Sequence, residues 1–111
     1  MKISEKRISD VVVLNLEGSL MGGPEAVSLN EAVNHHLDEK SLKLVLNLES
    51  VERVNSSGLG ILIKALTTFK TNGGVLKLAN VNPKVKNLLV ITKLDTILDS
   101  YDSVEAAVKS F

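Results

Sequence analysis

The sequence predicts a single α/β domain with a mixed or mostly parallel β-sheet. The main observation is that short segments rich in aliphatic and β-branched residues alternate with helical patterns, in the order β-β-α-β-α-β-α-β-α. The second is the length of 111 residues, which suits one ordinary domain with one core, and no repeat or linker divides the chain. We therefore expect one domain over residues 1–111.

The chain is predicted to begin with two strands and a helix. Lys2–Ile8 alternates weakly, and Val11–Gly18 is a β-branched run that closes on a glycine. Ser9 and Asp10 between them suit a tight hairpin turn. Pro24 favours a first helical position, so a helix is expected from about Glu25 to Glu39. Its apolar residues lie three or four apart on one face: Ala26, Leu29, Val33 and Leu37.

A strand and a second helix are expected next. The strand is Leu42–Leu48, and its inward candidates are the leucines at 42, 44, 46 and 48. The helix is expected from about Ser57 to Thr71, because Asn72-Gly73-Gly74 is a strong stop signal. The predicted core stripe of this helix is Leu59, Leu62, Leu66 and Phe69, flanked by Ile63 and Ala65.

The last third of the chain repeats this alternation. Val75–Asn80 is the next predicted strand, and Asn82 followed by Pro83 favours the start of a short third helix. The segment TILDSY predicts a short last strand. Ser103, with Ala106 in an incomplete capping box, is expected to open a final helix.

The composition excludes several classes of protein. Acidic and basic residues balance at 13 each, which argues against a nucleic-acid-binding surface. The absence of cysteine excludes disulfides and thiolate chemistry. The first ten residues are too charged for a signal peptide, and no apolar run approaches the roughly 20 residues of a membrane span. We expect a soluble cytoplasmic domain without membrane insertion.

The stretch VNSSGLGILI, residues 54–63, places two hydroxyls between a strand and a helix. A catalytic serine in a nucleophile elbow needs glycines two residues on either side, and Val54 precedes Ser56 by two. A dinucleotide fingerprint beginning at Gly58 would need its third glycine at Ile63, and the chain has no phosphate-binding GxxxxGK[ST] motif. Neither catalysis nor phosphate binding is therefore predicted here.

Other candidates for chemistry are equally weak. His35 and His36 are adjacent on the first predicted helix, where we expect one at the surface and one beside the apolar stripe. Metal-binding partners on a helix normally lie three or four residues apart, so no metal site or other cofactor is predicted. The remaining carboxylates near these elements are interpreted as solvated charges: Asp38, Glu39, Glu49 and Glu52.

Two interpretations of the serines stay open. Asn55, Ser56 or Ser57 could each cap the helix, but a cap needs only one such residue. The second interpretation is a docking surface that modification can switch. Ile61 supports it modestly, because a helical wheel places it well off the core stripe beside Lys64 and Thr68.

The segment from Leu44 to Leu98 resembles the anti-sigma factor antagonists, the bacterial members of the STAS domain family. Their motif D-S-[ST]-G-L-G follows a strand and opens a helix, and here it reads NSSGLG over residues 55–60. The glycine pair at 73–74 and the NPKVKNLLVITKLDTIL segment match as well. The resemblance covers nearly the whole chain. It implies a small mixed sheet with about four helices packed mainly on one side.

The resemblance also implies a function in transcription regulation, not an enzyme activity. The expected partner is an anti-sigma factor that is a serine kinase of the GHKL type, whose capture releases a sigma factor. That kinase would phosphorylate Ser56, with Ser57 as second choice, and a serine phosphatase would reset it. The implied partner-binding residues are Met21, Gly22, Asn55, Ser56, Ser57, Gly58, Leu59, Gly60, Ile61 and Lys64.

Two departures from the family pattern bear on this expectation. The leading aspartate of the motif is Asn55, and the acidic GE[IL]D segment before the first helix reads Gly18-Ser19-Leu20-Met21. Asn55 slightly favours an alternative function, a STAS scaffold subunit that is not phosphorylated, in a stressosome-like assembly or a lipid-transport ATPase. An enzyme or nucleotide-binding domain would need a ligand site that the sequence does not show.

Overall fold

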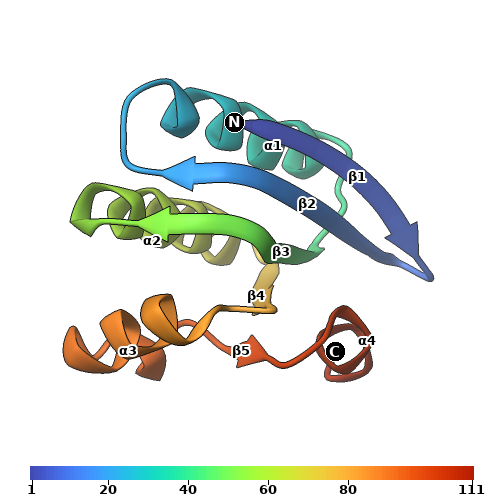
Figure 1. Cartoon of the computed structure of the whole chain (residues 1–111). Coiled ribbons are helices and arrows are strands. Elements are labelled where there is room, and N and C mark those ends of the chain that lie inside the picture. The colour runs from blue at the N-terminus through green and yellow to red at the C-terminus, as the bar shows by residue number, and fades with distance from the viewer.

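The computed structural model describes residues 1–111 as one mixed sheet with four α-helices and a short 3₁₀ helix (Figure 1). The predicted order of elements is confirmed. In chain order they are β1 (Lys2–Ile8), β2 (Val11–Leu20), α1 (Pro24–Asp38), β3 (Lys43–Val54), α2 (Ser56–Thr71), β4 (Val75–Ala79), α3 (Pro83–Ile91), η1 (Leu94–Thr96), β5 (Ser100–Tyr101) and α4 (Val104–Lys109).

The strands lie in the sheet in the order of the sequence, β1-β2-β3-β4-β5. The β1–β2 hairpin is antiparallel, with Ile8 opposite Val11, and the other three pairs are parallel. Each parallel connection crosses back through helical structure, as parallel strands require. The carboxyl ends of β2 and β3 therefore reach the same edge, as their arrowheads show in Figure 1.

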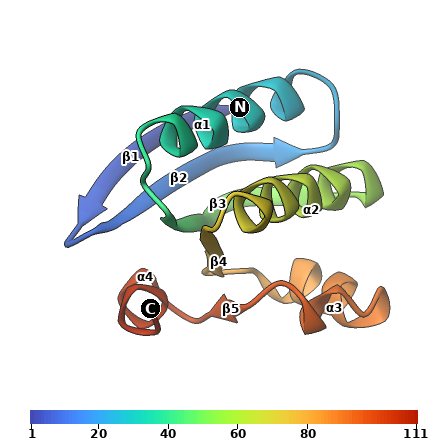
Figure 2. The ribbon, with the colours of Figure 1, turned by 180° about the vertical axis from the view of Figure 1, so that it is seen from behind.

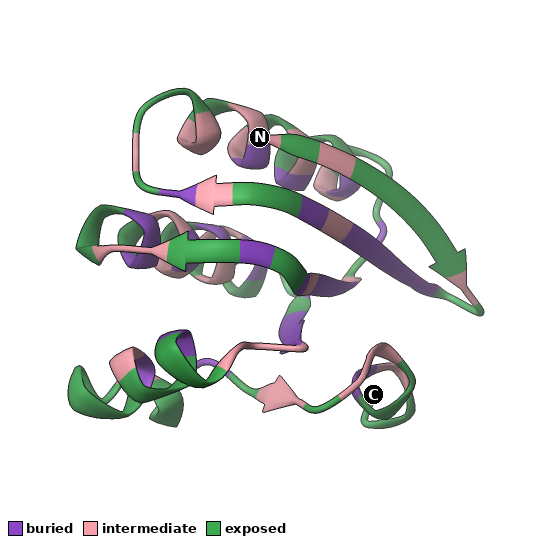
Figure 3. Cartoon of the chain, in the orientation of Figure 1, coloured by how far each residue is buried: buried purple, intermediate pink, exposed green.

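Two hydrophobic clusters hold the sheet between its helices. The larger lies on the face covered by α1 and α2, which Figure 2 shows in front of β2 and β3. The smaller lies on the opposite face under α4 and includes Val13, Val45 and Ala107. Figure 3 shows buried residues along the central strands and on the helix sides that face them, whereas β1 is largely exposed. The helices thus lie mainly on one side, as predicted, with α4 on the other.

The structure corrects some boundaries and core residues. β3 continues six residues beyond the predicted end at Leu48, because Val51 packs in the core and Val54 pairs with Leu20 of a longer β2. Leu42 is exposed, not inward, since it precedes the first residue of β3. In α2, Ala65 is buried and Leu66 only half-buried. The predicted last strand is reduced to Ser100–Tyr101.

No helix is long and apolar enough to cross a membrane.

Lys77 fixes α4 to the sheet. Its side chain is 8% exposed, and its Nζ donates hydrogen bonds to the Ser110 hydroxyl at 2.7 Å and carbonyl at 3.1 Å, and to the Tyr101 hydroxyl at 3.3 Å. The same ammonium lies 4.7 Å from the ring centroid of Phe111 and 5.3 Å from that of Tyr101. These contacts satisfy a cation that would otherwise be costly to bury.

Replacing Lys77 by alanine is expected to lower the free energy of unfolding by about 1–3 kcal/mol, because hydrogen bonds from a charged donor and packing of its stem are lost together. Urea unfolding measures the loss, and hydrogen exchange should show faster opening of α4. Lys109→Ala, at an exposed position of the same helix, is the control and should change stability by less than about 0.5 kcal/mol. Equal effects of the two variants would contradict this role of Lys77.

Candidate functional site at the start of helix α2

The site lies at the edge of the sheet where β2 and β3 end together. Leu20 is the register partner of Val54, so the chain leaves both strands at neighbouring points. β2 leads into the Met21–Gly23 loop before α1, and β3 leads into Asn55 before α2. The structure thus brings together the loop and the helix start, which lie more than 30 residues apart in the sequence.

Asn55 joins these two segments with three hydrogen bonds. Its Oδ1 accepts from the Gly58 N–H at 2.8 Å, which caps α2, and its Nδ2 donates to the Met21 carbonyl at 3.1 Å. Its backbone N–H donates to the Leu20 carbonyl at 3.2 Å. An aspartate could accept the capping bond but could not donate to Met21. The asparagine that replaces the motif's usual aspartate therefore has a structural use here.

Two substitutions of Asn55 distinguish the contributions of its two side-chain hydrogen bonds to stability. Asn55→Ala should cost about 1–2 kcal/mol, since both the cap and the Met21 bond are lost. Asn55→Asp keeps the cap and gains a favourable charge at the helix start, so its net change should stay within about 1 kcal/mol. Urea unfolding of both variants tests this. If the two variants are equally destabilised, the cap is not what Asn55 contributes to stability.

Neither Ser56 nor Ser57 caps helix α2. Helix α2 begins at Ser56, one residue before the predicted start, and Asn55 supplies the cap. Ser56 and Ser57 are both exposed, and neither hydroxyl makes a hydrogen bond within the chain. Of the two open interpretations, the cap therefore belongs to Asn55, and the hydroxyls remain available for another use.

Two glycines allow the loop, the strand and the helix to pack this closely. A Cβ on Gly58 would overlap the Leu20 carbonyl, so only glycine fits where α2 crosses the end of β2. Gly22 has φ +104°, and a Cβ there would lie 3.2 Å from Cβ of Ser57. Gly22 therefore lies directly against Ser57, and the loop and the serines form one continuous surface.

Shallow hollows flank this surface on two sides. One is lined by Met21 together with Arg53 and Lys84, and also by Glu52, Val54 and Val85. The other lies between α1 and α2 and contains Ile61 and Lys64, with Ala26, Val27, Leu29, Asn30 and Ala65. The first turn of α2 carries no acidic residue.

Three of the predicted partner-binding residues pack against the interior of the domain. Gly58 and Leu59 are buried, because Gly58 packs on Leu20 and Leu59 faces the core, so they position the site without being exposed on it. Ile61 is half-buried and packs against the core, not well off it. Sequence reasoning missed Val27, Arg53 and Lys84 beside the site. Of these, only Val27 could have been noticed in the sequence, because it is an apolar residue outside the predicted core stripe of α1, and it is exposed in the structure.

The histidines lie at the other end of α1 and supply no base to this site. His35 is exposed, as expected. His36 was expected at the edge of the apolar stripe, but it is only 2% exposed and therefore lies in the interior. The two adjacent histidines nonetheless approach Glu39 together. One ring nitrogen from each and a carboxylate oxygen of Glu39 all lie within 4.8 Å of one another.

Comparison with known proteins identifies the family. The sequence model of the STAS domain matches residues 2–107. The chain belongs to the STAS domain family. This confirms the resemblance that the NSSGLG motif indicated, and the mixed sheet with its strand–helix order is the STAS fold.

Similar STAS proteins include named regulators of sigma factors. The anti-sigma-B factor antagonist of Bacillus subtilis is 33% identical over 73 residues, covering 66% of this chain and 67% of its own. The anti-sigma F factor antagonist of Paenibacillus polymyxa is 28% identical over 96 residues, covering 84% and 80%.

Three solved structures show the same STAS architecture. The crystal structure of TM1081 from Thermotoga maritima is 28% identical with a TM-score of 0.88, covering 97% of this chain and 92% of that one. The anti-sigma factor antagonist SpoIIAA in its unphosphorylated form has a TM-score of 0.72 at 15% identity, covering 98% and 96%. SpoIIAA of Bacillus has also been solved in a phosphorylated form, with a TM-score of 0.73 at 16% identity, covering 99% and 100%.

Proposed function

We propose that this STAS domain is an anti-sigma factor antagonist whose binding is switched off by phosphorylation of Ser56. Its partner is an anti-sigma factor that is also a serine kinase of the GHKL type, and capture of that partner releases a sigma factor. A serine phosphatase restores the binding form. The work is done in the cytoplasm by protein contacts, without direct contact with nucleic acid, without membrane insertion and without catalysis by this chain.

The observation that carries the proposal is that the Ser56 hydroxyl is exposed and makes no hydrogen bond within the chain. Asn55 already caps α2, so Ser56 is not needed for the helix to begin. Ser56 is nonetheless exposed at the meeting point of two segments and lies next to Ser57, which is the second-choice acceptor. A serine that is exposed at a helix start and does not stabilise the fold is well placed to be modified.

The surface around Ser56 is suited to docking a protein. Met21 and Val27 are exposed apolar side chains that line the two hollows described above, and Ile61 and Lys64 line the one between α1 and α2. Asn55, Ser57, Gly22 and Gly60 complete the proposed contact surface, with Gly58 and Leu59 beneath it. Apolar side chains surrounded by polar ones are typical of protein interfaces.

A phosphate on Ser56 would act on binding and not on folding. It brings about −1.5 to −2 charges at pH 7. The amino end of a helix carries partial positive charge, so α2 tolerates the group. A partner surface fitted to a small neutral hydroxyl would have to strip the hydration shell of the phosphate and accommodate its bulk, which opposes docking.

A second candidate function is a STAS scaffold subunit that holds a partner without reversible phosphorylation. Asn55 favours it, because the motif's usual aspartate is missing at the position next to the acceptor serine. If that carboxylate helps a kinase to engage the serine, the kinase will act poorly on this chain. The docking surface would be the same in both cases.

Capture of partners from a lysate of the source cells distinguishes the two functions. Wild type and Ser56→Asp serve as bait, and circular dichroism confirms that both are folded. The proposal expects the wild type to capture a GHKL-type kinase and Ser56→Asp to lose it. Equal capture of the same non-kinase partner by both baits would favour the scaffold.

A further inference from the structure

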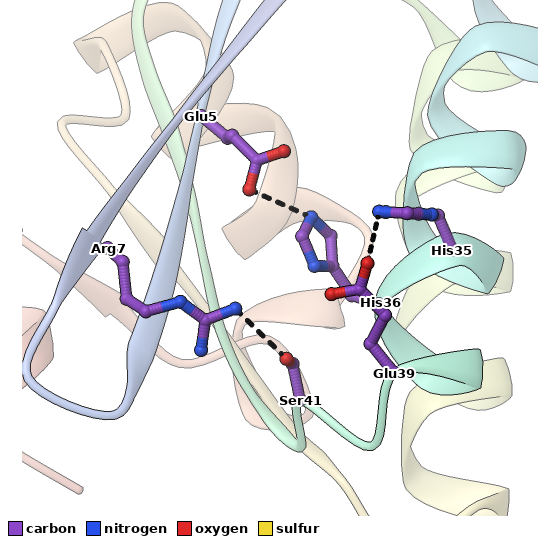
Figure 4. A network of polar contacts seen from close by, with 6 residues as sticks. All are labelled: Glu5, Arg7, His35, His36, Glu39 and Ser41. Atoms are coloured by element: carbon purple, nitrogen blue, oxygen red, sulfur yellow. Dashed lines mark hydrogen bonds and ion pairs between the residues drawn. The ribbon is translucent and has the colours of Figure 1, made fainter.

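The last turn of α1 carries a polar cluster that the proposed function does not use. Figure 4 shows the rings of His35 and His36 and the carboxylate of Glu39 converging there, with Glu5 of β1 on the far side of His36. His35 Nε2 lies 2.8 Å from Glu39 Oε1, and His36 Nε2 lies 3.6 Å from Glu5 Oε2. The cluster lies at the opposite end of α1 from the Met21–Gly23 loop.

Helix geometry explains why three residues at positions i, i+1 and i+4 converge. Successive residues are about 100° apart, so position i+4 lies one turn further on and between the directions of i and i+1. Glu39 therefore lies above both histidines and can reach either. One ligand atom from each of the three lies within 4.8 Å of the others.

His36 has an unused nitrogen inside the protein. Its side chain is almost fully buried, and its Nδ1 is buried without any hydrogen-bond partner. We assign the imidazole proton to Nε2, because that nitrogen faces the Glu5 carboxylate. This tautomer leaves a lone pair on Nδ1. A carboxylate on the second nitrogen is the usual companion of a histidine that binds a metal ion through the first.

We infer that His35, His36 and Glu39 form a binding site for a divalent transition-metal ion of the zinc type, with Glu5 orienting His36. Two imidazoles and one carboxylate are a ligand set that zinc accepts, whereas magnesium and calcium prefer all-oxygen sites. Ligands around tetrahedral zinc lie about 3.4 Å apart, given bonds of about 2.0–2.1 Å. Modest rotation of His35 and Glu39 closes the site, since their side chains are 58% and 50% exposed.

The Arg7 guanidinium beside this cluster donates to the Ser41 hydroxyl at 3.2 Å and is an opposing positive charge, whereas two other features favour a cation. The site lies at the carboxyl end of α1, where the helix dipole attracts positive charge. Glu31 lies one turn before His35 and lines a hollow together with Glu5, His35 and His36, which adds negative charge near the site.

Calorimetric titration of the untagged chain with Zn²⁺ tests the site, and a titration with Mg²⁺ tests its selectivity. The expected result is saturable binding of one zinc ion per chain and no detectable binding of magnesium. His35→Ala and Glu39→Gln should each weaken zinc binding by about tenfold or more, and Glu5→Gln should weaken it by about tenfold through His36. Asp38→Asn removes the same charge as Glu39→Gln at the neighbouring exposed position, and it should leave the affinity within about twofold.

His36 is tested without replacing a buried residue. Nitrogen-15 NMR of the imidazoles should show zinc-dependent shifts at Nδ1 of His36 and at one nitrogen of His35. Absence of saturable binding up to about 1 mM zinc, or unchanged affinity in both His35→Ala and Glu39→Gln, would overturn the inference. Ser56→Asp should bind zinc as the wild type does, so failure of the zinc site and failure of the proposed switch are separate results.

Discussion

Replacing Gly58 by alanine is expected to destabilise the domain by about 1–3 kcal/mol or more, although Gly58 lies in a helix where alanine is normally preferred. The added methyl group would overlap the Leu20 carbonyl and approach the Leu20 side chain. Backbone cannot rotate away as a flexible side chain can, so α2 would have to move off the end of β2. A shift in the thermal midpoint of about 4–8 °C per kcal/mol makes this easy to measure.

Gly60→Ala is the matched control, two residues further along α2. A Cβ at Gly60 meets nothing within 4 Å, so this variant should gain about 0.4–1 kcal/mol from helix propensity and lower chain entropy. The motif's two glycines thus have opposite predicted effects. Similar changes in stability for the two variants would show that α2 does not rest on Leu20 as described.

Ser56→Asp should abolish capture of the anti-sigma factor while the domain stays folded. A carboxylate held against a docked partner without a compensating cation costs about 2 kcal/mol or more, which is about 30-fold in Kd. The same carboxylate at the first residue of α2 is favourable for the helix, so the free energy of unfolding should not fall. Isothermal titration with the purified anti-sigma factor and urea unfolding give the two quantities.

Ser56→Ala and Ser57→Asp complete this experiment. Ser56→Ala removes the hydroxyl without adding charge, and it should retain most of the affinity because Asn55, not Ser56, caps the helix. Ser57→Asp places the same charge one residue away against Gly22 and should weaken binding less than Ser56→Asp. If Ser56→Asp binds the partner as tightly as the wild type, charge at this position is not the switch.

The arrangement of elements could be predicted because local signals agree with it. Asn82 and Ser103 both cap helices as expected, and the Asn72-Gly73-Gly74 signal does end α2. The β3 extension through Val54 could not be predicted, because Glu49–Arg53 is mostly polar and becomes a strand only by pairing with β2. The prediction that Leu42 points inward is wrong because an apolar residue next to a strand need not enter the core.

The position of the candidate site at the start of α2 could be predicted, but its contacts could not. The motif marked the start of α2 correctly, yet three neighbouring residues could all have been the cap. The Leu20–Val54 register places Met21 beside Asn55. Only this contact explains why an asparagine is used, since its amide both donates to the Met21 carbonyl and accepts the capping bond from Gly58. The cluster at His35, His36 and Glu39 was missed because pairwise spacing rules do not include a third residue one turn away.

The measurement that tests the central claim most directly is phosphate mapping by mass spectrometry after incubation with ATP and the proposed partner, an anti-sigma factor of the GHKL kinase type. The account predicts one phosphate on the wild type at Ser56, the same on Ser57→Ala, and none on Ser56→Ala. No phosphate on the wild type, or a phosphate that persists in Ser56→Ala, would contradict the claim that Ser56 is the switch.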